Sequence, residues 1–376
     1  MEMIKKIRSF AIMAMLILPC QLLASEVSPQ TTQIFDQIRQ VTSFPCNHEK
    51  IPPSSKEVES LFHYAQYLEQ QGPDSYTEAN ESAFNAIARY YRIAAAKNDY
   101  RAQTALIDFL YKYRPDSEYY SNSSTEQRRL RDGEIAQLRE KLLQQKTAAG
   151  YLAKAGVLAQ QWQVDEAIAY YYLAAMAGNA EGQYKLAEYL DDSQIISKIG
   201  IPHPPKDAWQ RAKELYLCAA EQGHQSAWGN AAALELRFGK DESVMTLLQR
   251  GVTAGSTQSA ILLEAIFLGK PLDQIFRGEK INRRKLNIKP DPERARRYAI
   301  YFQFLLSHEN NFVVSNVIIP DVNKYIPLPP APLPEWDGVL PQQKPAIVAV
   351  EKPAEELIEK LSREENLDPA SGTPLH

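Results

Sequence analysis

Residues 165–190 read DEAIAYYYLAAMAGNAEGQYKLAEYL, and this stretch decides the fold. Tyr171 precedes a small pair, the alanines at 174–175, by three and four positions, so these residues share one face of a helix. Gly178 then ends that helix, because glycine tolerates the left-handed conformation found at helix C-termini. A second run, 181–190, again places apolar residues at helical spacing. The stretch therefore predicts an amphipathic helical hairpin.

Three further segments carry the same pattern: ARYYRIAAAKNDYRA (88–102), KELYLCAAEQGHQSA (213–227) and TLLQRGVTAGSTQSA (246–260). The turn glycine recurs as Gly223 and Gly255, and Asn98 takes its place in the first copy. The wide interval between Asn98 and Gly178 predicts a degenerate repeat near 140–160. Since single hairpins are too small to fold alone and bury a continuous core only when stacked, the pattern predicts an all-α solenoid.

The stretch 165–190 resembles a Sel-type repeat, the variable-length relative of the tetratricopeptide repeat, and AKELYLCAAEQGHQSAW (212–228) is similar to it at the small pair and the Gly-His turn. The resemblance covers 165–239 clearly and 85–110 and 241–269 more loosely. In the last copy, Gly251-Val252 replaces the alanine pair. The resemblance implies a right-handed α–α solenoid of tetratricopeptide/Sel-type hairpins.

A wider resemblance covers most of the chain. Its segments are SFPCNHEKIPP (43–53), RYYRIAAA (89–96) and DVNKYIPLPPAPLPEWDG (321–338). They are similar to segments of an uncharacterised family of Gram-negative envelope proteins that flank Sel-type repeats with such pieces. This family implies no established activity.

The first 24 residues have the order of a secretory signal peptide. Basic residues at positions 5, 6 and 8 precede the apolar run FAIMAMLIL (10–18), and the small residues Ala24 and Ser25 follow. The run is too short to span a bilayer. Lipidation at Cys20 is an alternative, but Pro19 fits a lipobox poorly. We therefore expect a cleaved signal over 1–24, a periplasmic location and no transmembrane segment in the mature chain.

Two of the three cysteines, Cys46 and Cys218, lie beyond the signal region. Export places them where a disulfide can persist, so they are a candidate pair. The alternative is two separate buried thiols. No Cys-x-x-Cys or paired histidine accompanies them, and we expect no metal site.

The remaining domain boundaries follow from composition. We expect an N-terminal lead-in over 25–57, the solenoid over 58–305, an extended proline-rich strap over 306–350 and a C-terminal helix over 351–368. Large apolar residues alternate with the strap's prolines, which favours packing along the repeats over the alternative, a docking peptide for another protein's groove. A polar stretch (117–127) and a proline-rich insertion (197–207) read as loops. The last residues, 369–376, are expected to be disordered.

The sequence contains no convincing catalytic constellation. No Gly-x-Ser-x-Gly elbow, phosphate-binding loop or His-Glu-x-x-His motif is present, and the six histidines are isolated. We therefore expect no enzymatic activity and no cofactor. A net charge of −4 and export both argue against nucleic acid. Arginines and lysines dominate residues 277–297, which predicts either a local basic patch or, more simply, a solvated loop and amphipathic helix.

Two functions fit these features. The first is an immunity protein that occludes a secreted toxin, such as a lipase or a wall hydrolase, in the periplasm. The second is an envelope scaffold that binds endogenous proteins or peptidoglycan. Both require a binding surface, and our candidate partner-binding residues, all in the best-matched repeats, are Tyr170, Trp209, Trp228 and Arg237.

Overall fold

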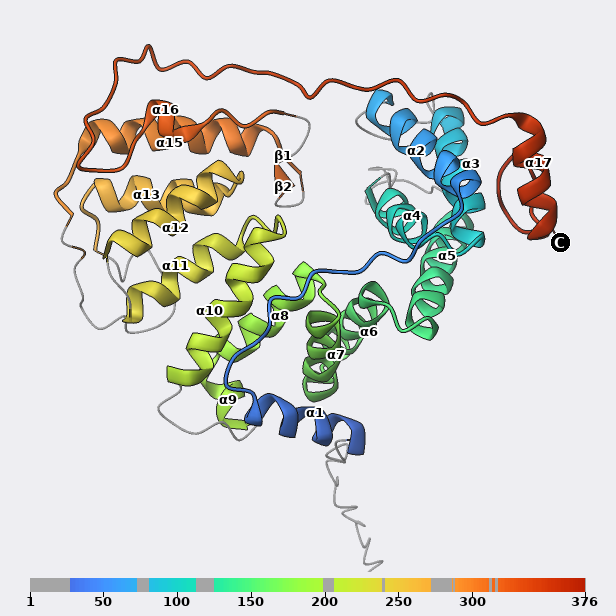
Figure 1. Cartoon of the computed structure of the whole chain (residues 1–376), viewed down its shortest axis with the longest axis horizontal. Helices are drawn as coiled ribbons and strands as arrows, with labels where there is room; N and C mark the ends of the chain where they lie inside the picture. Colours follow the sequence, from blue (N-terminus) through green and yellow to red (C-terminus); the bar gives the residue numbers. More distant parts are fainter. Residues whose placement is uncertain are drawn as a thin grey trace, which may run out of the picture.

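The structure, a computed structural model, describes residues 28–72, 81–112, 125–198, 206–238, 241–271, 286, 288–310, 313–314 and 317–375. Within them the regular secondary structure is helical apart from two two-residue strands, β1 (Glu309–Asn310) and β2 (Val313–Val314). Successive helices pack on one another along the chain, so the prediction of an all-α solenoid is confirmed (Figure 1).

Five helical hairpins repeat through the described part of the solenoid. Their helices are α3 (Glu81–Ala96) with α4 (Tyr100–Lys112), α5 (Thr125–Gln144) with α6 (Ala148–Gln160), α7 (Val164–Met176) with α8 (Ala180–Asp191), α10 (Lys206–Glu221) with α11 (Ala227–Phe238), and α12 (Asp241–Thr253) with α13 (Thr257–Phe267). A residue with positive φ separates the two helices of every pair: Asn98, Lys146, Gly178, Gly223 and Gly255. The degenerate repeat expected near 140–160 is the α5–α6 pair, where Lys146 with φ 55° replaces the glycine.

Helices outside the five pairs complete the described part of the solenoid. Helix α1 (Pro29–Gln40) packs on α7, and α2 (Lys56–Gln71) packs on α3. The short α9 (Ser193–Lys198) follows α8, and α15 (Pro292–Ser307) packs on α13. Their buried side chains join three successive hydrophobic clusters, so the core runs the length of the solenoid.

The strap predicted over 306–350 begins later, because α15 runs to Ser307 and β1 and β2 follow it. From here on we use the name for residues 317–352, which begin on α15 and leave the solenoid at its C-terminal end (Figure 1). It contains one short helix, α16 (Val322–Tyr325), and is otherwise extended. Val322, Ile326 and Leu340 are buried against α12, α13 and α15. The first part of the strap thus packs on the last helices of the solenoid, as the alternation of prolines and large apolar residues predicts. Residues 341–349 are exposed, where the strap crosses toward α17 (Figure 1).

The chain then folds into a clasp, residues 353–375. Its helix α17 (Glu355–Glu364) buries Ile358 and Leu361 in the cluster formed by α2, α3 and α4. The prediction of a disordered tail over 369–376 is wrong for the described residues. Leu367 and Pro374 form a β-bridge, and Asp368 accepts a hydrogen bond from the Ser371 hydroxyl at 2.7 Å. These turn bonds and the burial of Leu367 hold the end of the chain in place.

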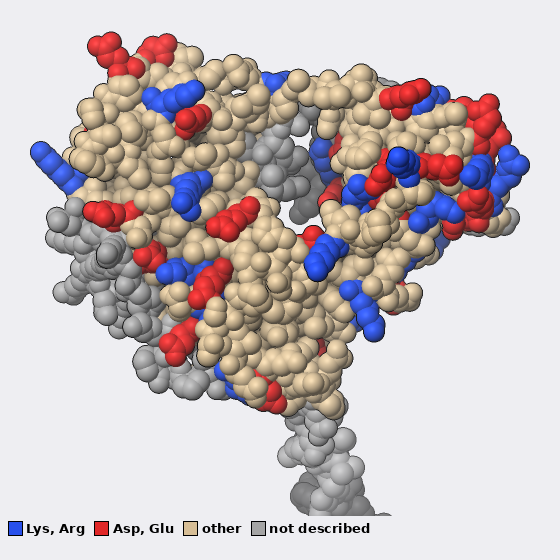
Figure 2. Space-filling view, viewed as in Figure 1, with Lys and Arg blue, Asp and Glu red and all other residues tan. Residues whose placement is uncertain are grey.

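Strap and clasp together close the molecule into a ring (Figure 1). The strap starts at the last repeat, and the clasp docks at the first. Figure 2 shows acidic and basic side chains crowded together over α2, α3 and α17, where the ring closes. The predicted signal peptide lies outside the described residues, as do residues 199–205 of the proline-rich insertion predicted over 197–207. The ends of that insertion are not loop, because residues 197–198 belong to α9 and residues 206–207 to α10.

Candidate partner-binding groove

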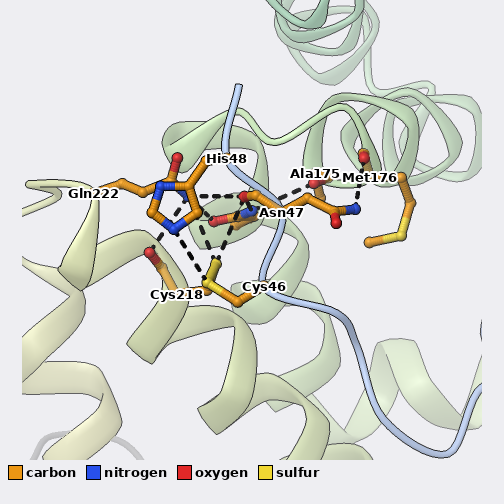
Figure 3. The surroundings of a disulfide bond; sticks show 8 residues. Cys46, Asn47, His48, Ala175, Met176, Cys218 and Gln222 are labelled. Atoms are coloured by element: carbon orange, nitrogen blue, oxygen red, sulfur yellow. Dashed lines mark hydrogen bonds between the residues drawn. A yellow bond between two sulfur atoms is a disulfide. The ribbon is translucent and has the colours of Figure 1, made fainter. Parts of the chain in front are cut away.

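A crossing segment, residues 41–55, runs from α1 to α2 over the intervening repeats (Figure 1). A disulfide between Cys46 and Cys218 ties it to α10 (Figure 3). Phe44 is buried against Tyr172, and Arg211 donates to the carbonyls of Ile38 and Val41 at 2.6 and 2.8 Å. The segment is therefore a fixed part of the repeat surface.

Asn47 is the most heavily bonded residue of the crossing segment (Figure 3). Its side chain donates to the Met176 carbonyl at 2.9 Å. Its carbonyl accepts from the side-chain amides of Gln183 at 2.8 Å and Gln222 at 3.2 Å. These hydrogen bonds fix Asn47 to the last residue of α7, to α8 and to the residue that follows α10. Beside it, the crossing segment passes so close to Gly178 that a Cβ there would lie 2.4 Å from the His48 carbonyl carbon.

Beyond Asn47 the crossing segment forms one wall of an open cavity of about 650 Å³. This cavity, which we call the groove, takes Glu49 and Ile51 from the crossing segment. Its other walls come from α2, α4, α5, α7 and α8, and α6 forms its floor. The floor residues, spaced for one helical face, are Ala149, Leu152, Ala153, Gly156, Val157 and Gln160.

Gly156 sets the depth of the groove. A Cβ added at this residue would meet no heavy atom within 4 Å. Gly150, one and a half turns earlier on α6, is the opposite case, because a Cβ there would lie 2.3 Å from the backbone of Leu142. One glycine of α6 thus serves packing against α5, and the other leaves room above the floor.

Hydrogen bonds tie the crossing segment to the floor of the groove. The Tyr100 hydroxyl donates to the Glu49 carboxylate and accepts from the Ala149 amide at 3.3 Å. Burial and the bond to Glu49 raise the pKa of Tyr100 well above its usual range, so the phenol stays protonated. Tyr100 therefore couples the wall at Glu49 to the first turn of α6.

The rim of the groove carries charges of both signs. Arg101 donates to Glu59 at 3.0 Å, and its guanidinium lies over the Phe62 ring. On α8, burial disfavours the charged form of Glu181, yet the hydrogen bond from His224 at 2.8 Å lowers the pKa of that carboxyl. Burial also raises the pKa of Asp108, assisted by repulsion from Glu69 and opposed by Arg139. An apolar floor between charged rims suits a protein segment.

None of the four predicted partner-binding residues lines the groove. Trp228 is buried, with 7% of its surface exposed, so the prediction that it anchors a partner is wrong. Trp209 is half-buried and packs against the central cluster. Tyr170 lies in a separate small hollow beside α1. Arg237 belongs to α11, and its side chain lies outside the described part of the structure.

The sequence pattern did not point to the residues that shape the groove, because they belong to segments of ordinary repeat composition. The run AAGYLAKAGVLAQ, which becomes α6, looks like any small-residue helix. Its one available signal is a pair of glycines inside a helix, which is costly without a packing or functional reason.

Two arginines at the end of the basic cluster (277–297) hold the strap on α15. Arg294 and Arg297 are buried on α15, with 8% and 5% of their surfaces exposed. Arg297 donates to the Tyr325 carbonyl at 2.7 Å and the Pro334 carbonyl at 2.9 Å. Arg294 donates to the Pro327 and Ala331 carbonyls. At these two positions the expected basic patch is wrong, because the guanidinium groups donate to strap carbonyls that the proline-rich chain leaves unpaired. The amphipathic helix of the alternative is α15, and residues 277–285 lie outside the described part of the chain.

The described residues hold no group of histidine, cysteine, aspartate or glutamate side chains that could bind a metal ion. No helix in the described part of the chain is both long and apolar enough to cross a membrane.

Comparison with known proteins gives one family and several structures. A family model described as a domain of unknown function, DUF6396, matches residues 265–375, from α13 to the end of the clasp. No curated protein matches the chain. The chain is similar in structure to Pseudomonas aeruginosa 5086, with 18% identity, a TM-score of 0.47, and coverage of 77% of this chain and 96% of the other.

Two further structures are similar. The immunity protein Pa5087 of Pseudomonas aeruginosa has 16% identity and a TM-score of 0.46, with 77% of this chain and 96% of the other covered. The protective antigen c5321 of uropathogenic Escherichia coli, which has an SLR fold, has 19% identity and a TM-score of 0.40, with 67% and 46% covered. Likenesses at this level assign no function to this chain.

Proposed function

We propose that this chain is an exported, non-enzymatic protein-binding solenoid of the Sel-repeat type that holds a protein partner in the groove. The groove is the observation that carries the proposal. It is about 650 Å³, open to solvent, and built from the crossing segment and six helices. Its floor is apolar, and a Cβ added at Gly156 would meet no heavy atom within 4 Å outside the backbone of its own helix. A side chain of a partner can therefore reach the helix backbone there.

Within this class, we propose an immunity protein of the periplasm that occludes a secreted lipase or wall hydrolase. This finer proposal comes from the resemblance to exported Sel-repeat proteins and from the signal-like N-terminus of the sequence. Steric occlusion needs only a rigid surface of complementary shape, and the disulfide-tied crossing segment makes the groove rigid.

The test compares two glycine substitutions of equal chemistry. Gly156→Leu fills the floor of the groove, whereas Gly133→Leu adds the same side chain to α5, where a Cβ also meets nothing within 4 Å. Gly133 does not line the groove. Each mature protein (residues 25–376) is immobilised and exposed to extract of its own species, and the captured proteins are identified by mass spectrometry.

We expect one partner to be captured by the parent and by Gly133→Leu, and at least about tenfold less by Gly156→Leu. Equal capture by both variants would place binding elsewhere. A captured hydrolase whose activity is lost in the complex supports immunity. Capture of resident envelope proteins or wall fragments instead would favour the scaffold and remove the immunity proposal.

A further inference from the structure

The disulfide that holds the crossing segment is open to attack on one side only. Cys46 is exposed, whereas Cys218 keeps 3% of its surface exposed. The His48 imidazole lies 3.8 Å from the Cys46 sulfur, and the Gln222 side-chain amide lies 3.6 Å from the Cys218 sulfur (Figure 3). An incoming thiolate therefore reaches Cys46 first and leaves negative charge on Cys218.

We propose that the Cys46–Cys218 disulfide is a redox latch, and that a dithiol reductant opens it and frees the crossing segment from the groove. A thiolate of the dithiol attacks the Cys46 sulfur, the disulfide breaks, and its electron pair leaves on Cys218. The amide N–H of Gln222 stabilises that thiolate until it takes a proton. The second thiol of the dithiol then attacks the mixed disulfide and releases Cys46 as a thiolate beside His48. The dithiol is oxidised, and two protein thiols are formed.

Release changes the groove because the crossing segment is part of its wall. Glu49 and Ile51 line the groove, and only a few residues separate them from Cys46. Without the latch, the remaining anchors nearby are the bonds of Asn47, the burial of Phe44 with the hydrogen bond from its backbone amide to Glu214 at 3.2 Å, and the bond from Tyr100 to Glu49. These contacts are non-covalent and few, and most residues of the segment are exposed; exposed segments with few contacts open locally at low cost. This consequence for partner binding rests on the proposed function of the groove.

The latch itself is tested without a partner. Trypsin cleaves after Lys50 only if it can bind the residues on both sides, which include Asn47. Lys146, at the α5–α6 turn, is also exposed, lies inside the solenoid and reports unfolding of the repeats. Cleavage rates after both lysines are measured for the protein with and without dithiothreitol, and for the Cys46→Ser/Cys218→Ser variant with and without it.

We expect reduction to speed cleavage after Lys50 by about tenfold or more, with the Lys146 rate unchanged. The double variant should show the fast rate throughout and ignore dithiothreitol. An unchanged Lys50 rate on reduction would show that the non-covalent contacts suffice, and a parallel rise at Lys146 would show that the disulfide supports the whole fold. Either result overturns the latch. Neither depends on the Gly156→Leu experiment, so the two proposals fail separately.

Discussion

At the scale of the residue, the two glycines of α6 show how one amino acid serves two purposes. Gly150 lets α5 and α6 approach until backbone meets backbone, as the 2.3 Å position of a built Cβ near Leu142 shows. Gly156 meets nothing and keeps the groove open. The residue type is the same, and only the surroundings differ.

Alanine substitutions should separate the two roles. Gly150→Ala must push α5 away, and we expect it to lower the free energy of unfolding by about 1–3 kcal/mol. Gly156→Ala removes backbone entropy from the unfolded chain at no steric cost, and we expect a gain of about 0.5–1 kcal/mol. Urea denaturation of both variants measures the difference. A lower free energy of unfolding for Gly156→Ala than for Gly150→Ala would contradict the packing described for α6.

At the scale of the element, α15 fastens the strap with arginine side chains. Arg297 is buried and donates to two strap carbonyls, and its guanidinium lies over the Trp336 ring. Glu293 pairs with both Arg296 and Arg297. These hydrogen bonds lower the pKa of the Glu293 carboxyl to about 2, and the bond from Arg296 has the larger effect. Arg296, the residue just before Arg297, faces solvent, with 51% of its side chain exposed.

These neighbouring arginines make a matched pair. Arg297→Ala leaves the Tyr325 and Pro334 carbonyls without their donor, and we expect a loss of about 2–3 kcal/mol in the free energy of unfolding. Arg296→Ala removes an exposed pair with Glu293, and we expect a change within about 0.5 kcal/mol. Thermal and urea denaturation compare them. Similar effects from both would mean that the strap needs no arginine anchor.

At the scale of the whole molecule, the clasp ties the C-terminal end of the chain to the first repeats. Buried Ile358 and Leu361 supply the apolar contact. Ion pairs surround it, between Arg89 and Glu355 at 2.8 Å and between Lys97 and Glu364 at 2.8 Å. The crowded charges of Figure 2 mark this closure. We therefore expect the closure of the ring to depend on pH and salt.

Acid should loosen the clasp before it unfolds the repeats. Hydrogen bonds from Lys352 and Arg89 lower the pKa of Glu355, and a bond from Lys97 lowers the pKa of Glu364. Carboxyls whose folded pKa is lowered stabilise the closed ring above their unfolded value of 4.5, and that stabilisation is lost as the pH falls through the folded pKa. Hydrogen exchange of the α17 amides should therefore speed up between about pH 5 and pH 3, relative to α7.

A variant supplies the control for this pH dependence. Glu355→Gln/Glu364→Gln cannot form the charged pairs, so its α17 should exchange faster at neutral pH and respond less to acid. High salt should weaken the parent's clasp in the same direction, because both carboxylates are largely exposed. Exchange in α17 that ignores pH and salt in the parent would show that the apolar contact alone closes the ring.

How far the sequence predicts this protein differs from feature to feature. The solenoid follows from local pattern, because the small pair and the turn residue of each hairpin act within a few positions of one another. The pattern also located the α5–α6 repeat, although Lys146 with its positive φ replaces the glycine. Large apolar residues among the prolines predicted that the strap packs on the repeats, and Val322 and Ile326 are indeed buried there.

The groove and the ring could be decided only by the tertiary structure. Trp228 looks like a binding anchor in the sequence, and its burial follows from which helices stack on it. Gly156 and Gly150 differ only in what faces them. The order of the last residues depends on contacts with α3, hundreds of positions earlier in the chain. Repeat patterns specify nearest-neighbour packing, whereas a groove wall built by residues 41–55 and a clasp built by residues 353–375 depend on contacts between segments far apart in sequence, which no local pattern encodes.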